Sequence, residues 1–80
     1  MKIKVIVTLK KGVLDPQGKA IQQTLNGMTF SDVKQVRQGK YFDIDVNMED
    51  EKKAKAKVEE MCKKLLANLV IENYKIIGTQ

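Results

Sequence analysis

The stretch KIKVIVTLKKGVLDPQG, residues 2–18, contains a strand, a turn and the start of a helix. Apolar and polar residues alternate over residues 2–10, which is the pattern of a half-buried strand. Asp15 stands where a helix N-cap is expected, because its carboxylate can accept a hydrogen bond from an unpaired first-turn amide. Pro16 has no amide hydrogen and therefore fits the first helical position. Gly18 exposes bare backbone in that turn, where a partner or ligand could approach closely.

The pattern continues as a helix, two strands, a second helix and a final strand. The first helix is predicted to run from Pro16 to Asn26, and Gly27 provides its stop signal. Gly39 interrupts the extended region that follows, so this region is interpreted as two strands joined by a tight turn. The two strands are placed at residues 33–38 and 40–47.

The second helix is predicted to begin near Asp50 and to end near Asn68, before a last strand at residues 74–77. Its apolar residues at helical spacing are Ala54, Val58, Met61, Cys62, Leu65 and Leu66. The order βαββαβ predicts an α+β fold, a ferredoxin-like sandwich over residues 1–80 as a single domain. In that sandwich two helices cover one face of a four-stranded antiparallel sheet.

Such a sandwich leaves the other face of its sheet uncovered. Ile6, Val36 and Tyr41 are expected to point toward this open face. Scattered apolar side chains are normal on the surface of a monomer. A thin domain with an open sheet face, however, gains stability by pairing with a second copy. The sequence therefore predicts a homodimer or a dimer of dimers that uses these three residues.

Composition excludes several classes of function. Eighty residues bury only about 60% of the surface that the unfolded chain exposes, so a deep catalytic cleft is hard to build. The chain has no histidine, the commonest general base and metal ligand. Its single cysteine, Cys62, excludes an internal disulfide and a cysteine-rich zinc site, and it fits a reducing cytoplasm. Neither a secretion signal nor a membrane-spanning segment is predicted.

The remaining sequence features are assigned structural roles. Much of the basic charge is spread along the lysine-rich second helix, where glutamates precede lysines by four residues, as on a solvated helix face. Cys62 lies on the apolar stripe of that helix and is interpreted as a core residue. Asp43, Asp45 and the acids at residues 49–51 do not have the spacing of a compact metal-binding loop. No phosphate-binding glycine motif is present. No catalytic residue, cofactor site or metal site is therefore predicted on this chain.

Two other classes of protein share the predicted order of elements. Residues 38–42 faintly resemble the aromatic box of RNA-recognition motifs, but Phe42 is in phase with the core residues of its strand. The first strand also has no aromatic residue on which a base could stack, so no nucleic-acid partner is predicted. A small-molecule sensor domain of the ACT type is the second alternative, and ligand-dependent thermal shifts would support it.

Three segments together resemble one family, PurS, the small subunit of phosphoribosylformylglycinamidine synthase in de novo purine synthesis. The resemblance spans essentially the whole chain, with the segments in the same order and at the same spacings. One departure is Leu69, where the family pattern leads us to expect proline. The three segments are VTLKKGVLDPQGKA at 7–20, VRQGKY at 36–41 and MCKKLLAN at 61–68, which continues into VIENY at 70–74.

The resemblance implies a role in converting formylglycinamide ribonucleotide, glutamine and ATP into formylglycinamidine ribonucleotide, glutamate, ADP and phosphate. It places ATP and Mg²⁺ on a large synthetase subunit and the nucleophilic cysteine on a separate glutaminase subunit. It implies that this chain is an inactive structural bridge that holds the two partners together for ammonia transfer.

The residues expected to contact the partner subunits lie in two short segments. Local folding accounts for Asp15 and Pro16 as cap and first helical residue, but not for Gln17 and Gly18. Arg37 and Lys40 flank a tight turn, where a long cation has no obvious role within the chain. A carboxylate or phosphate on a partner is a suitable target for such a cation. The predicted contact set is Asp15, Pro16, Gln17, Gly18, Arg37, Gly39 and Lys40.

Overall fold

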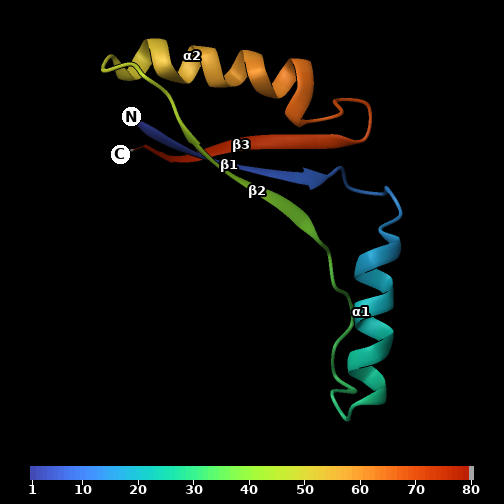
Figure 1. Ribbon diagram of the computed structural model, residues 1–80. Coiled ribbons are helices and arrows are strands. Elements are labelled where there is room, and N and C mark those ends of the chain that lie inside the picture. Colours follow the sequence, from blue (N-terminus) through green and yellow to red (C-terminus); the bar gives the residue numbers. More distant parts are fainter. Residues whose placement is uncertain (80) are drawn as a thin grey trace.

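The computed structural model describes residues 1–79 and contains three strands, two α-helices and a π-helical turn (Figure 1). The strands form one antiparallel sheet in the order β2-β1-β3. In chain order, the elements are β1 (Lys2–Leu9), α1 (Pro16–Gly27), β2 (Gly39–Asp45), α2 (Glu51–Met61), the π-helical turn Cys62–Leu66 and β3 (Glu72–Thr79).

The core lies between one face of this sheet and α2. The alternation predicted for the first strand is confirmed, since Ile3, Val5 and Val7 are buried and the residues between them are not. Helix α2 and the π-helical turn after it together contribute one buried residue at every fourth position. The fully buried residues of these elements are Ile3, Val5 and Val7 on β1 with Ala54, Val58 and Cys62 on the helical segment.

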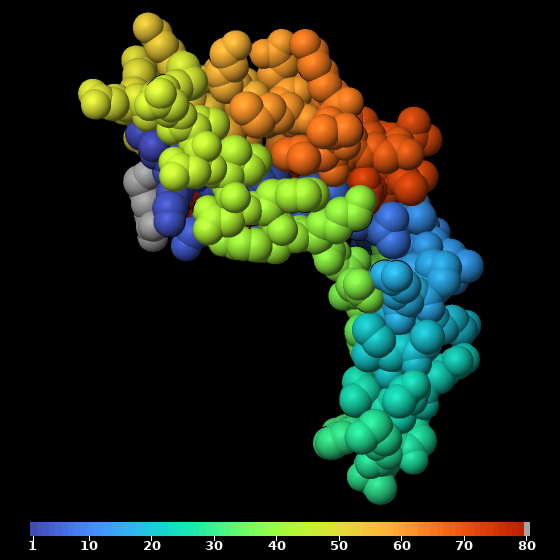
Figure 2. Space-filling model, in the orientation of Figure 1, coloured from blue at the N-terminus to red at the C-terminus, as the bar shows by residue number. Residues whose placement is uncertain are grey.

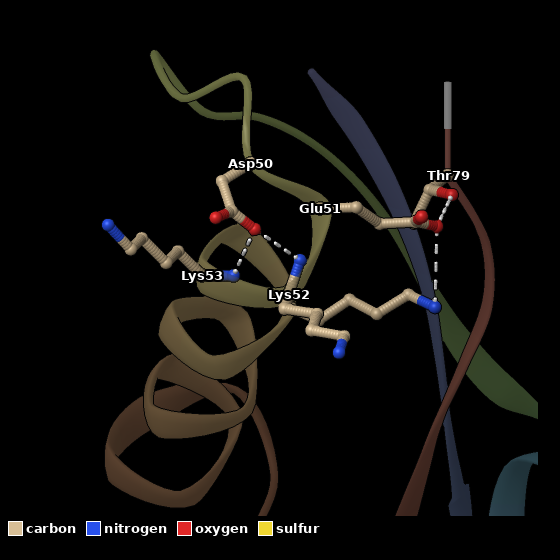
Figure 3. Close-up of polar contacts among 6 residues, drawn as sticks. Asp50, Glu51, Lys52, Lys53 and Thr79 are labelled. Atoms are coloured by element: carbon tan, nitrogen blue, oxygen red, sulfur yellow. Dashed lines mark hydrogen bonds and ion pairs between the residues drawn. The ribbon is translucent and has the colours of Figure 1, made fainter.

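Polar contacts fix the first turn of α2 (Figure 3). Asp50 is its N-cap, and one carboxylate oxygen accepts hydrogen bonds from the amides of Lys52 and Lys53 at 3.0 and 3.3 Å. Glu51 accepts a hydrogen bond of 2.7 Å from the Thr79 hydroxyl. This bond ties the beginning of the helix to the end of β3, so α2 is held along the sheet from its first residue.

The predicted four-stranded sandwich with two covering helices is wrong. The sheet has three strands, and only α2 packs on it. Residues 33–38 are irregular rather than a strand, because their backbone groups have partners elsewhere. The Asn26 side-chain amide donates to the carbonyl of Val33 at 3.2 Å, and the Gln38 amide donates to the Asp15 carboxylate at 2.6 Å.

Residues 13–38, which we call the arm, stand away from the body formed by the sheet and α2 (Figures 1 and 2). The arm consists of α1 and the irregular segment that returns beside it. The molecule measures 49 × 26 × 14 Å and has a radius of gyration of 16.0 Å. A compact chain of this length has a radius of gyration of about 12 Å. The arm contributes no residue to the hydrophobic core.

One helix end and one apolar stripe differ from the prediction. Gly27 is the last residue of α1 rather than its stop, and the residue with positive φ is Thr29, at 86°. The Phe30 amide closes this end by donating to the carbonyl of Leu25 at 3.0 Å. Of the apolar stripe predicted for the second helix, Met61 and Leu65 are not buried. The stripe is wider than the single sheet face that α2 covers.

Candidate functional site

The candidate site is a recess of about 350 Å³ at the corner where the sheet meets the arm. The end of β1 and the starts of α1, β2 and β3 enclose it. Most of the residues predicted to contact partners come together here, although they are far apart in the sequence. The recess is lined by Val7, Leu9, Asp15, Pro16, Gln17, Gln38, Gly39, Lys40 and Glu72. We call it the corner pocket.

Asp15 is the N-cap of α1, as predicted, and it also bonds the returning segment of the arm. One carboxylate oxygen accepts the Gly18 amide at 2.8 Å, and the other accepts the Gln38 amide at 2.6 Å. The Asp15 residue is only 6% exposed. The Gln38 amide, with the Gly18 amide as a second donor, holds the pKa of this carboxyl below its ordinary value. Asp15 is therefore charged at neutral pH, and its carboxylate links the start of α1 to the segment that returns from the arm.

Gly18 and Gly39 are required by close approaches within the chain. A Cβ on Gly18 would collide with the carbonyl oxygen of Val36 and lie 2.8 Å from a carboxylate oxygen of Asp15. A Cβ on Gly39 would lie 2.7 Å from the carbonyl oxygen of Val7. The bare backbone at Gly18 therefore accommodates the returning segment of the arm.

Two cations of the corner also have partners within the chain. The Arg37 guanidinium donates to the carbonyl oxygens of Val13 and Lys10 at 2.7 and 3.2 Å. The Lys40 ammonium lies 3.4 Å from the carboxylate of Glu72, across the end of β1. The premise that Arg37 and Lys40 lack roles within the chain is thus wrong.

Glu72 and Gln38 belong to the site but were not predicted. Glu72 is buried, and its carboxylate accepts the Asn68 amide at 2.7 Å. That amide, together with the Lys40 ammonium, lowers the pKa of the Glu72 carboxyl against the opposing effect of burial. The sequence feature that could have indicated Glu72 is its position as an acidic residue just before the alternating residues of the last strand. Gln38 gave no signal, since its backbone amide is what contributes.

The predicted self-association residues do not all share one surface. Ile6 and Tyr41 are directly opposite each other on β1 and β2, on the sheet face away from α2. Tyr41 is 56% exposed there. Val36 instead lies half-buried in the arm, with its carbonyl against Gly18.

The corner pocket has its carboxylates engaged within the chain and its edge exposed. Its carboxylates, Asp15 and Glu72, accept backbone amides, while Pro16 and Gln17 are exposed at its edge. The thiol of Cys62 is fully buried in the core, and burial, reinforced by Glu59, raises the pKa of the Cys62 thiol. Within residues 1–79, no three potential metal-ligating side chains gather, and neither α-helix has the length and apolar character needed to span a bilayer.

Comparisons with known proteins agree on one family. The PurS family model, described as phosphoribosylformylglycinamidine (FGAM) synthase, matches residues 2–80. Subunit PurS of phosphoribosylformylglycinamidine synthase from Methanocaldococcus jannaschii is 55% identical over 75 residues, which are 94% of this chain and 90% of that protein.

Solved structures give the same result. The crystal structure of M. jannaschii PurS, described as one of the subunits of formylglycinamide ribonucleotide amidotransferase in the purine biosynthetic pathway, superposes with a TM-score of 0.84 at 54% identity. That match covers 95% of this chain and 92% of the other. A chain in the structure of PurLQS from Thermotoga maritima superposes with a TM-score of 0.84 at 31% identity, and the match covers 99% of both chains.

Gly18→Ala is expected to destabilise the protein, because the new methyl group meets backbone that cannot move aside as a flexible side chain would. Overpacking of this kind costs about 1–3 kcal/mol. In a domain of this size each kcal/mol lowers Tm by roughly 4–8 °C. Gly27→Ala is the matched control, since nothing lies within 4 Å of its Cβ position and alanine favours a helix. Thermal melts in which both variants behave alike would contradict this account of Gly18.

Asp15→Asn is expected to flatten the dependence of stability on pH. The pKa of Asp15 in the folded protein lies below its unfolded value of about 3.9. Its contribution is therefore present above pH 4 and is lost as the pH falls through the folded pKa. Denaturant unfolding at several values between pH 2 and pH 7 measures this slope. The wild type should lose its advantage over the variant on acidification, and a constant difference between the two proteins would contradict the assignment.

Proposed function

The chain belongs to the PurS family of phosphoribosylformylglycinamidine synthase subunits, and from this premise we propose that it joins the glutaminase to the synthetase without taking part in the chemistry. The glutaminase releases ammonia from glutamine. The synthetase uses that ammonia and ATP to convert formylglycinamide ribonucleotide into formylglycinamidine ribonucleotide. Family membership takes precedence over the sensor-domain and RNA-binding alternatives, whose support was the shared order of elements.

The observation that carries the proposal is the division of this small chain into a body and an arm. The body places its one thiol in the core, with the pKa raised. The arm extends the molecule to 49 Å without enclosing a space of catalytic size. An elongated surface of this kind suits contact with more than one protein. The solved relative within a PurLQS structure supports the same role.

The proposal assigns the nucleotide chemistry to the partner. ATP and Mg²⁺ are placed on the synthetase subunit, because this sequence contains neither a GxxxxGK[ST] nor a GxGxxG motif. The complex is placed in the cytoplasm, in line with the single unpaired cysteine.

The corner pocket is the proposed contact with a partner subunit. Asp15, Gly18 and Gly39 shape the pocket through contacts within the chain. Pro16 and Gln17 are exposed at its edge. Lys40 and Arg37 keep exposed positions while contacting their own chain, so either can also donate a hydrogen bond to an acidic or carbonyl group of a partner. The contact therefore depends chiefly on the exposed residues, with the buried ones as support.

The open sheet face is the proposed surface for association between copies of this chain. Tyr41 and Ile6 form an apolar cross-strand pair at its centre. Such a pair is the kind of contact that stabilises sheet packing when a second face covers it. Val36 is not part of this surface.

Reconstitution of the three-subunit enzyme tests the bridging role. Omitting this chain should abolish glutamine-dependent turnover while ammonia-dependent turnover by the synthetase persists, and the purified chain alone should be inactive. Gln17→Ala should weaken assembly by about 2- to 10-fold if it removes one interfacial hydrogen bond. Gln23→Ala, an exposed glutamine on the same helix, is the matched control. Full glutamine-dependent activity without this chain would refute the proposal, and equal effects of the two glutamine variants would refute the corner contact.

Tyr41→Lys tests the open sheet face. A lysine at the centre of a packed interface loses its hydration without gaining a partner, so association should weaken at least tenfold. Tm at low concentration should change little, because Tyr41 is exposed in the single chain. Sedimentation of the purified chain at micromolar concentration measures the mass. Val70→Lys, at an exposed apolar residue between α2 and β3, is the control, and a Tyr41 variant with wild-type mass would contradict this surface.

A further inference from the structure

At the far end of the arm, one side chain bonds the returning segment at two points. The side-chain nitrogen Nδ2 of Asn26, in the last turn of α1, donates hydrogen bonds to the carbonyl oxygens of Phe30 and Val33 at 2.9 and 3.2 Å. The Asn26 residue is half-buried. These two bonds, which we call the arm latch, connect the end of the helix to the start of the segment that leads back to the body.

The turn that the arm latch spans contains a residue in an unfavourable conformation. Thr29 has a φ of 86°, in the left-handed region that β-branched residues rarely adopt. Such a conformation costs roughly as much as one or two hydrogen bonds contribute, and it persists only where surrounding contacts fix it. Here the Phe30 amide donates to the carbonyl of Leu25 at 3.0 Å, while the arm latch holds the Phe30 carbonyl. Loss of the arm latch therefore favours opening of this turn.

The residue that forms the arm latch is followed by glycine. Asparagine is thermolabile because its side chain can lose ammonia. A glycine that follows it hinders this loss least, since it has no side chain to obstruct the approach of its backbone nitrogen. Asn26-Gly27 is the one Asn-Gly pair in the chain, because the other asparagines, Asn47, Asn68 and Asn73, precede larger residues. In the unfolded chain, Asn26 is thus the asparagine that reacts most readily.

The reaction requires no reactant other than water. The backbone nitrogen of Gly27 attacks Cγ of Asn26, and a new C–N bond forms between these two atoms. The bond between Cγ and Nδ2 breaks, and Nδ2 leaves as ammonia with the proton that the Gly27 nitrogen has released. Water then opens the resulting cyclic imide, which leaves aspartate or isoaspartate at position 26.

The folded arm opposes this attack in two ways. Gly27 is the last residue of α1, so its N–H is directed along the helix to the carbonyl four residues earlier. The arm latch engages Nδ2, the leaving group, and holds the Asn26 side chain against the carbonyls of Phe30 and Val33. The attack therefore requires the helix end to fray and the arm latch to open, which is a local unfolding event.

We propose that Asn26 is a site of spontaneous deamidation that the closed arm latch suppresses, and that the reaction removes the arm latch once it has occurred. The product has a carboxylate in place of the donor amide, and a carboxylate repels the two carbonyl oxygens that the amide had bonded. Its negative charge lies at the C-terminal end of α1, where the helix dipole disfavours it. Residues 20–31 contain no other charge.

The opening is confined to the far half of the arm. The near half is fixed separately, by the bond from the Gln38 amide to the Asp15 carboxylate and by the bonds of the Arg37 guanidinium. Deamidation of Asn26 therefore frees the turn beyond α1 while the corner pocket keeps its shape. The two halves can be followed independently in the same molecule.

Peptide mass spectrometry of the full chain, incubated at alkaline pH, measures the reaction. Trypsin releases residues 20–34, which contain Asn26 and no other asparagine. Deamidation at Asn26 should be at least about tenfold slower in the folded chain than in urea. Gly27→Ala keeps the arm latch, since nothing lies within 4 Å of the new methyl group, and should slow the reaction in urea. Equal rates in the folded and unfolded wild type, or an unmodified Asn26 in urea, would overturn the proposal.

Amide hydrogen exchange measures the arm latch itself. Asn26→Asp has the composition of the aspartate product and should speed exchange of the Phe30 and Val33 amides by about tenfold, while the Gln38 amide is unaffected. Gln23→Glu makes the same change of amide to carboxylate at an exposed residue of α1 and should leave all three amides as in the wild type. If circular dichroism shows that Asn26→Asp does not fold, Asn26→Ala replaces it, since it removes the two bonds without adding charge. Wild-type exchange at Phe30 and Val33 in the folded variant would refute the arm latch.

Discussion

The position of the arm depends on the carboxylate of Asp15, which is bonded at both oxygens. One bond begins α1 at Gly18, and the other captures the Gln38 amide just before β2. The chain leaves the body near Gly18 and returns to it at Gln38. Because a charged acceptor makes stronger hydrogen bonds than a neutral one, this single carboxylate can fix both the start of α1 and the returning segment. Gly18 is part of the same constraint, since the returning segment passes where a Cβ would be.

The sequence predicts structure that depends on neighbouring residues, and it does not predict structure that depends on contacts with a distant segment. The alternation of β1 and the capping role of Asp15 depend on neighbours a few residues away, and both are confirmed. Residues 33–38 include the apolar residues Val33 and Val36, and this pattern fits either an edge strand or an irregular segment. The backbone of this segment is hydrogen-bonded to the side chains of Asn26 and Asp15 instead of to a neighbouring strand. No periodicity in the segment itself encodes those partners.

The corner pocket illustrates the same limit for function. Five of the seven residues predicted to contact partners line it, and the other two, Gly18 and Arg37, lie beside it. Three of the seven, Gly18, Arg37 and Lys40, have roles within the chain that the sequence did not indicate. Sequence reasoning treated each unexplained residue as a sign of an external partner. Glu72 went unnoticed because its role needs the cross-strand neighbour Lys40 and the turn amide of Asn68. A buried acid at a strand start becomes informative only once the strand order is known.

A chain of 80 residues cannot cover an extended arm with a core of its own. Its buried hydrophobic residues lie in the body, while the arm leaves Ile21 and Met28 exposed. Conformational entropy opposes the ordering of such a segment, and burial of apolar area is the main term that offsets it. Contact with another molecule would therefore add to the stability of the arm. In the bridging role proposed for this chain, the segment that lacks a core is the one available for assembly.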